Sequence, residues 1–197
     1  PIDATALPPT TTFTTFLAAH TAHLRSLLAT AVATNTPHAH LPYTVVATDG
    51  GHRAFPDTPS STTAAAVFCY PDLTAPPQNQ ATATSSPLPS WLHHPMIPYF
   101  AIAALLPPHI GNSPSSNNTG ENLAACLALE ILPTTHQTLL IVDSSVTRET
   151  VLSLRAPSHH TTHRTSIRNT IPGVSSSIAI RIQNALHRLV QSPPLSP

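Results

Sequence analysis

Apolar residues recur along this chain with two different spacings, which separate predicted helices from predicted strands. A helical stripe runs through residues 10–34, and helical spacing returns at 121–132, 144–155 and 175–190. Short apolar runs bounded by Pro or Gly predict four strands, at residues 43–49, 64–70, 99–106 and 139–142. We expect Gly50 and Gly51 to break the first of these strands.

The order of these elements predicts an α/β fold with a mixed sheet and helices packed on it. Three antiparallel strands come first, and a helix then leads by a right-handed crossover to a fourth strand that is parallel to the first. Residues 1–40 are interpreted as an N-terminal helix and linker. Residues 41–197 are interpreted as one domain, with a long Pro/Gln/Ser/Thr loop at 71–96.

Charge and composition bear on which partners the chain could bind and on where in the cell it is expected. All eight Lys and Arg residues are arginines, and eight acidic residues bring the formal charge to zero. The net charge therefore gives no indication of a nucleic-acid or membrane partner. No apolar run approaches the roughly 18 residues of a membrane span, and no signal-peptide pattern is present. We therefore expect an intracellular chain, nuclear or cytoplasmic, with no membrane partner.

Three of the eight acidic residues stand where elements begin or end. Asp49 ends the first predicted strand, Asp143 ends the fourth, and Glu121 opens the helix between the third and fourth strands. If the first and fourth strands are parallel neighbours, the three carboxylates meet in one small volume. They can stay ionised together there only if cations neutralise them. Oxygen ligands favour Mg²⁺ or Mn²⁺, and two such ions suit phosphodiester hydrolysis.

The segments that carry these acids resemble the motifs of the type 1 ribonuclease H family. They are ATDGG (47–51), NNTGENLAACLALEIL (117–132) and LLIVDSS (139–145). The family pattern is a strand ending in Thr-Asp-Gly-Ser, then a Glu followed by Ala-Ala and Ala-Leu-Glu, then an apolar strand ending in Asp-Ser. The resemblance covers about residues 43–191 and implies a ribonuclease H-like fold.

The resemblance implies an enzyme that cuts the RNA strand of an RNA–DNA hybrid. Asp49 would bridge two Mg²⁺ ions (Mn²⁺ being the alternative), and Glu121 and Asp143 would complete the ligands. Asn117 and Asn118 would bind the hybrid in its minor groove. Gly50 would let the backbone approach a ribose, where the 2′-hydroxyl distinguishes RNA from DNA.

Three departures from the family pattern keep alternatives open. The family's fourth carboxylate and its neighbouring histidine are absent, which we attribute to a final strand and helix missing beyond Pro197. Gly51 stands where the family usually has a serine. The sequence also has no cluster of basic residues of the kind with which many family members bind the hybrid. These features and the first residue, Pro1, suit a segment of a retroelement polyprotein that works beside a reverse transcriptase domain. The alternatives are a degenerate module that binds nucleic acid or protein without cutting, and another nuclease or transposase of the superfamily.

The remaining reactive side chains are given structural interpretations. Cys69 and Cys126 lie in apolar runs and are expected to be free, buried thiols. Glu130 is expected to be a solvated helix residue. The histidines of segment 158–164 are expected to be incidental surface groups, and Trp91 is expected to cover an edge of the core.

Overall fold

A computed structural model describes most of the chain as one mixed sheet with helices. The described residues are 2–3, 13–34, 43–54, 61–76, 93–106, 109–110, 113–114, 116–132, 137–155 and 176–191. Trp91 and the histidines of segment 158–164 lie outside these ranges, so their interpretations stay predictions. None of the helices within the described ranges combines the length and the hydropathy needed to cross a lipid bilayer.

Four long strands form the sheet, and each predicted strand corresponds to one of them. They are β2 (Tyr43–Arg53), β3 (Ser61–Pro71), β4 (Met96–Leu106) and β7 (Gln137–Val142). Their order in the sheet is β4-β3-β2-β7, with β2 antiparallel to β3, β3 antiparallel to β4, and β7 parallel to β2. The predicted α/β fold, with three antiparallel strands and a parallel fourth, is confirmed at this level.

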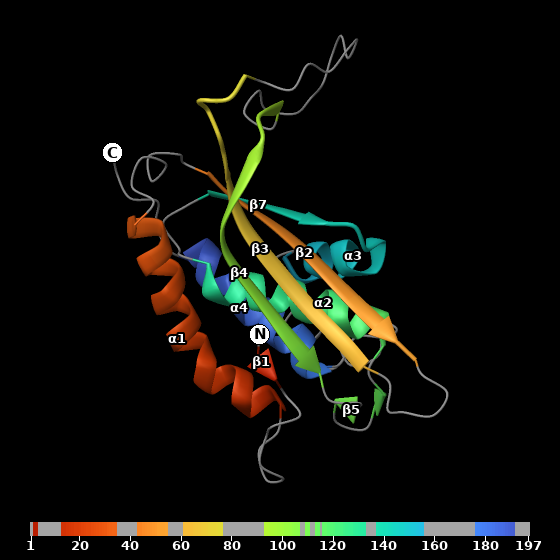
Figure 1. The fold of residues 1–197 in the computed structure, drawn as a ribbon. Coiled ribbons are helices and arrows are strands. Elements are labelled where there is room, and N and C mark those ends of the chain that lie inside the picture. The colour runs from red at the N-terminus through yellow and green to blue at the C-terminus, as the bar shows by residue number, and fades with distance from the viewer. Residues whose placement is uncertain are drawn as a thin grey trace.

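Short strands and four helices complete the described part of the molecule. Two-residue β1 (Ile2–Asp3) pairs parallel with β4, while β5 (His109–Ile110) and β6 (Ser113–Pro114) pair with each other. The helices are α1 (Phe13–Thr34), α2 (Asn117–Ile131), α3 (Ser145–Arg155) and α4 (Ser176–Gln191). Figure 1 shows α2 and α4 behind the sheet, α1 along its β4 side and α3 beside β7.

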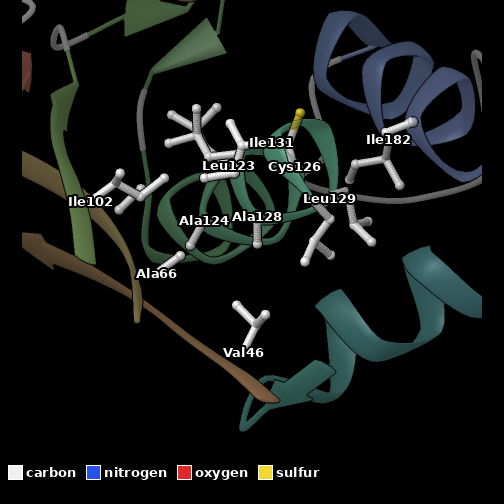
Figure 2. Packing of buried hydrophobic residues seen from close by; sticks show 14 of the residues in the cluster. Val46, Ala66, Ile102, Leu123, Ala124, Cys126, Ala128, Leu129, Ile131 and Ile182 are labelled. Carbon is white, nitrogen blue, oxygen red and sulfur yellow. The ribbon is translucent and has the colours of Figure 1, made fainter. Parts of the chain in front are cut away.

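Helix α2 lies at the centre of the core, between the sheet and α4. Because strand side chains alternate between faces, Val46, Ala66 and Ile102 all point toward α2. Figure 2 shows them opposite Ala124 and Ala128, with α4 on the other side of the helix. Small alanines on α2 let the helix approach the strands closely, and nearly every residue of α2 after its first turn is buried. Leu24 and Leu28 of α1 belong to the same core.

The predicted break at Gly50 and Gly51 is wrong, because β2 continues through both glycines to Arg53. Its pairing with β3 carries on past Asp49, from Gly50 opposite Ala64 to Arg53 opposite Ser61. The cross-strand hydrogen bonds of β3 therefore hold the segment extended, although glycine has little intrinsic preference for a strand. Asp49 consequently stands within a strand rather than at a turn.

The arginines of α1 and α4 cap the C-terminal end of α2, where backbone carbonyls lack helical partners. Arg25 donates to the Glu130 carbonyl at 2.7 Å, and Arg188 donates to the carbonyls of Leu129 and Leu132 at 2.8 and 2.9 Å. The side chain of Glu130 forms an ion pair with Arg181, and both side chains are largely buried. The expectation that Glu130 is solvated is therefore wrong.

The two cysteines are both free thiols, as expected. Cys126 is buried in the core, as expected, but Cys69 on β3 is partly exposed, so the expected burial is wrong for Cys69. Burial raises the pKa of both thiols, so neither has thiolate character at neutral pH. They act as small apolar side chains.

Candidate metal centre

The parallel pairing of β2 and β7 places Asp49 and Asp143 at the same end of the sheet. Thr48 is opposite Val142 in the register of these strands. Asp49 and Asp143 are the next residue on each strand path, so their side chains begin from adjacent backbone positions. Thr48 also donates its hydroxyl to the Ile141 carbonyl across this pair at 3.4 Å. The sequence prediction depended on these two strands being parallel neighbours, and they are.

Two glycines bring the third carboxylate, Glu121, to the same place. A Cβ atom on Gly50 would overlap the backbone of Gly120 and Glu121, and a Cβ on Gly120 would overlap the carbonyl oxygen of Thr63. Helix α2 therefore lies directly on the backbone of β2 and β3 at this point, with no side chain between them. This close approach requires glycine at both positions.

The three carboxylates form a cluster that could hold a metal ion. One oxygen atom from each of Asp49, Glu121 and Asp143 lies within 4.8 Å of the other two. Oxygens that share one Mg²⁺ at about 2.1 Å stand no more than about 4.2 Å apart, so small side-chain rotations would close the set on an ion. Asp49 and Asp143 are exposed, whereas Glu121 is only 4 % exposed.

Burial and like charge both act on Glu121. Burial is the main cause that raises the pKa of its carboxyl group, and the neighbouring carboxylate of Asp143 raises it further. The backbone N–H of Gly50 donates to this carboxylate and partly offsets the pKa increase. Without a cation, the ionised form of Glu121 is thus less favourable than that of a free carboxyl group. A divalent cation among the three groups would reverse that balance, since it favours the ionised form of each.

One atom of Glu121 gives a second observation that fits a cation ligand. Its Oε2 is buried and makes no hydrogen bond within the described part of the chain. Buried carboxylate oxygens are normally bonded, and hard divalent cations take oxygen ligands of this kind. The residues present therefore fit a Mg²⁺ or Mn²⁺ site.

The predicted substrate residues belong to the helix that carries Glu121, although the sequence analysis began that helix at Glu121. Helix α2 begins at Asn117, not at Glu121, so Asn117 and Asn118 occupy its first turn and Glu121 its second. The side chain of Asn117 is exposed and that of Asn118 is partly exposed. Gly50 contacts the same end of the helix. Asn117 and Asn118 therefore lie about one helical turn from Glu121, and Gly50 lies against it.

The sequence analysis missed Ser116, which fixes the start of α2. Its hydroxyl accepts the Thr119 N–H at 3.3 Å, and its own N–H donates to the Thr119 hydroxyl at 3.2 Å. This reciprocal cap is the Ser-x-x-Thr variant of a known pattern that usually ends in Glu or Gln. The pattern SNNT at 116–119 was therefore a usable signal that the helix starts four residues earlier than expected.

No protein-family model matches this chain, and searches of curated proteins and of solved structures found no significant match.

Proposed function

We propose that this chain is a metal-dependent endonuclease of the ribonuclease H type, which hydrolyses the RNA strand of RNA–DNA hybrids as part of a reverse-transcribing element. The convergence of Asp49, Glu121 and Asp143 within 4.8 Å carries the proposal. The three residues come from distant parts of the chain, in the order and on the elements that the ribonuclease H motifs imply. A strand-helix-strand path that places three carboxylates together has no evident structural purpose, because their mutual repulsion costs stability.

The proposed centre would hold two Mg²⁺ ions, or Mn²⁺ ions, which supply an activated water and charge stabilisation for the leaving oxygen. Asp49, on β2, would be one of the ligands. Glu121, held by the Gly50 N–H and by burial, would approach from α2. Asp143, directly before α3, would approach from β7.

Residues around the cluster provide the features that a hybrid substrate requires. Asn117 and Asn118 present amide groups, which can both donate to and accept from sugar and base edges in a minor groove. Gly50 is partly exposed beside the carboxylates, with the backbone of α2 against its Cα. The formal charge of the whole chain is zero, so electrostatic attraction to a hybrid is weak. A neighbouring reverse transcriptase domain would supply that affinity.

The test is cleavage of an end-labelled RNA–DNA hybrid in Mg²⁺ by the wild-type chain and by its Asp49→Asn variant. The proposal predicts internal cuts in the RNA strand only, with loss of cleavage in Asp49→Asn and in the presence of EDTA. Single-stranded RNA and duplex DNA serve as parallel substrates. Cleavage of duplex DNA instead of the hybrid would favour the nuclease or transposase alternative. Hybrid binding without cleavage by either protein would favour the degenerate binding module.

A further inference from the structure

Two helices of the candidate metal centre begin with the same Ser-x-x-Thr pattern, but the threonine behaves differently in each. In α2, Thr119 completes the reciprocal cap with Ser116. In α3, the N–H of Thr147 donates to the Ser144 hydroxyl at 3.2 Å, so half of the cap is made. The hydroxyl of Thr147 does not accept a hydrogen bond from the Ser144 N–H in the way that Thr119 accepts one from Ser116. Instead it is buried and makes no hydrogen bond with any described residue.

An oxygen atom of α2 is also buried without a hydrogen-bond partner among the described residues. Asn122 is 0 % exposed, and its amide nitrogen donates to the Asn118 carbonyl at 2.7 Å. Its Oδ1 is buried and has no hydrogen-bond partner in the described part of the chain. Helices α2 and α3 contact each other, and each contributes one of these buried oxygen atoms. One atom can donate a proton and the other can only accept one.

Both residues lie close in the sequence to ligands of the proposed cation. Asn122 directly follows Glu121 on α2, and Thr147 is about one helical turn beyond Asp143 on the path into α3. Unpaired buried oxygens destabilise a fold, and apolar side chains of the same shape would serve the packing better. Sites where a sequence departs from such packing rules are often functional. The departure here occurs on the helix that carries Glu121 and on the helix that follows Asp143.

We propose that Asn122 and Thr147 are positioning residues of the metal centre, and that their oxygen atoms share one buried water molecule that links α2 to α3. This link holds Glu121 and Asp143 at the separation that a divalent cation requires. A buried water normally makes about three hydrogen bonds to polar groups that lack other partners, and these two oxygens meet that description. The inference rests on the proposed function, since it concerns how the same carboxylates are held.

The test compares Thr147→Val with Thr147→Ser, by titrating Mn²⁺ into the purified chain in a calorimeter. Valine keeps the shape of threonine and loses the hydroxyl, whereas serine keeps the hydroxyl and loses the methyl group. We expect Mn²⁺ affinity to fall about tenfold in Thr147→Val, which is the lower end of the range for residues that support metal ligands. Thr147→Ser is expected to bind Mn²⁺ as the wild-type chain does. Equal affinity in Thr147→Val and wild type, or weaker binding by Ser than by Val, would overturn the inference.

Two further measurements separate positioning from packing. In EDTA, Thr147→Val is expected to melt only slightly below wild type, because it loses one hydrogen bond to the linking water. It should stay folded at the temperature of the titration, so that its weaker Mn²⁺ binding cannot result from unfolding. The double variant Asn122→Leu/Thr147→Val is expected to lose no more Mn²⁺ affinity than either single variant, because the two residues act through one link. Additive losses would contradict a shared water.

A crystal structure of the metal-free wild-type chain tests the link without reference to function. It should show an ordered water within hydrogen-bonding distance of both Asn122 Oδ1 and Thr147 Oγ1. If that water is absent, the inference fails even where Mn²⁺ binding is intact. If the wild-type chain binds no Mn²⁺ at all, the proposed function fails and the positioning role fails with it.

Discussion

A methyl group on Gly50 would overlap the backbone nitrogen of Glu121. The same glycine donates its own N–H to the Glu121 carboxylate. One residue therefore sets both the closeness of α2 to the sheet and the position of a carboxylate in the cluster. Packing and the candidate site are coupled at this contact, so changes here should affect both.

We predict that Gly50→Ala destabilises the chain by about 2–4 kcal/mol, because the added Cβ meets backbone that cannot move aside. Gly51→Ala is the matched control. Its Cβ would meet only the hydroxyl of the Thr63 side chain, at 3.1 Å, so it should cost less than about 1 kcal/mol. Urea unfolding measures both changes. Equal effects at the two positions would show that α2 is not in contact with Gly50.

We predict that Glu121→Gln stabilises the metal-free chain at neutral pH. Because burial and Asp143 raise the pKa of Glu121 in the folded state, its contribution to stability is greatest at acidic pH. That contribution is lost as pH rises from the ordinary carboxyl pKa through the raised one. Glutamine cannot ionise, so the variant should gain about 1 kcal/mol over wild type near pH 8 and little near pH 4.

Thermal melting in EDTA across this pH range measures the effect, with the exposed residue of the Glu149→Gln variant as control. Addition of Mg²⁺ should raise the melting temperature of wild type and leave Glu121→Gln unchanged. A Glu121→Gln variant that melts below wild type at pH 8 in EDTA would show that the carboxylate is already stabilised by protein groups.

We predict that Arg181→Met destabilises the chain by about 2–4 kcal/mol, because it leaves the carboxylate of Glu130 largely buried and unpaired. Replacing both partners, in Glu130→Leu/Arg181→Met, should recover part of that loss. Arg155→Met on the exposed surface of α3 is the control and should change stability by less than about 0.5 kcal/mol. A double variant that is less stable than Arg181→Met would contradict this account of the pair.

We predict that Asn117→Ala and Asn118→Ala each raise KM for a hybrid substrate about threefold to tenfold, the range for loss of one hydrogen bond, with little change in kcat. Asn184, exposed on α4, provides the control variant Asn184→Ala. Steady-state cleavage kinetics at fixed Mg²⁺ separate the two parameters. A fall in kcat with constant KM would place these amides in the chemical step instead.

The carboxylate cluster was predictable because each acid marks the limit of an apolar segment. Once Asp49 and Asp143 are placed on parallel neighbouring strands, elementary sheet geometry brings them together. The succession of four strands and the central helix along the chain was predictable from the spacing of apolar residues. These features depend on local pattern and on few possible topologies.

Other features required knowledge of contacts between distant segments. The continuation of β2 through Gly50 and Gly51 depends on hydrogen bonds to β3, and the capping of α2 depends on arginines more than fifty residues away. The pairing of Glu130 with Arg181 has no local sequence signal. The start of α2 at Asn117 was the exception, since the Ser116 cap could have been recognised.

Mn²⁺ binding measured by electron paramagnetic resonance tests the central claim most directly, because it needs no substrate and no assumption about the reaction. The account predicts saturable binding that Mg²⁺ displaces, with affinity at least about tenfold lower in Asp49→Asn and in Asp143→Asn than in wild type. Glu149→Gln should bind as wild type does. Absence of saturable binding, or equal affinity in all four proteins, would show that Asp49, Glu121 and Asp143 do not share a cation.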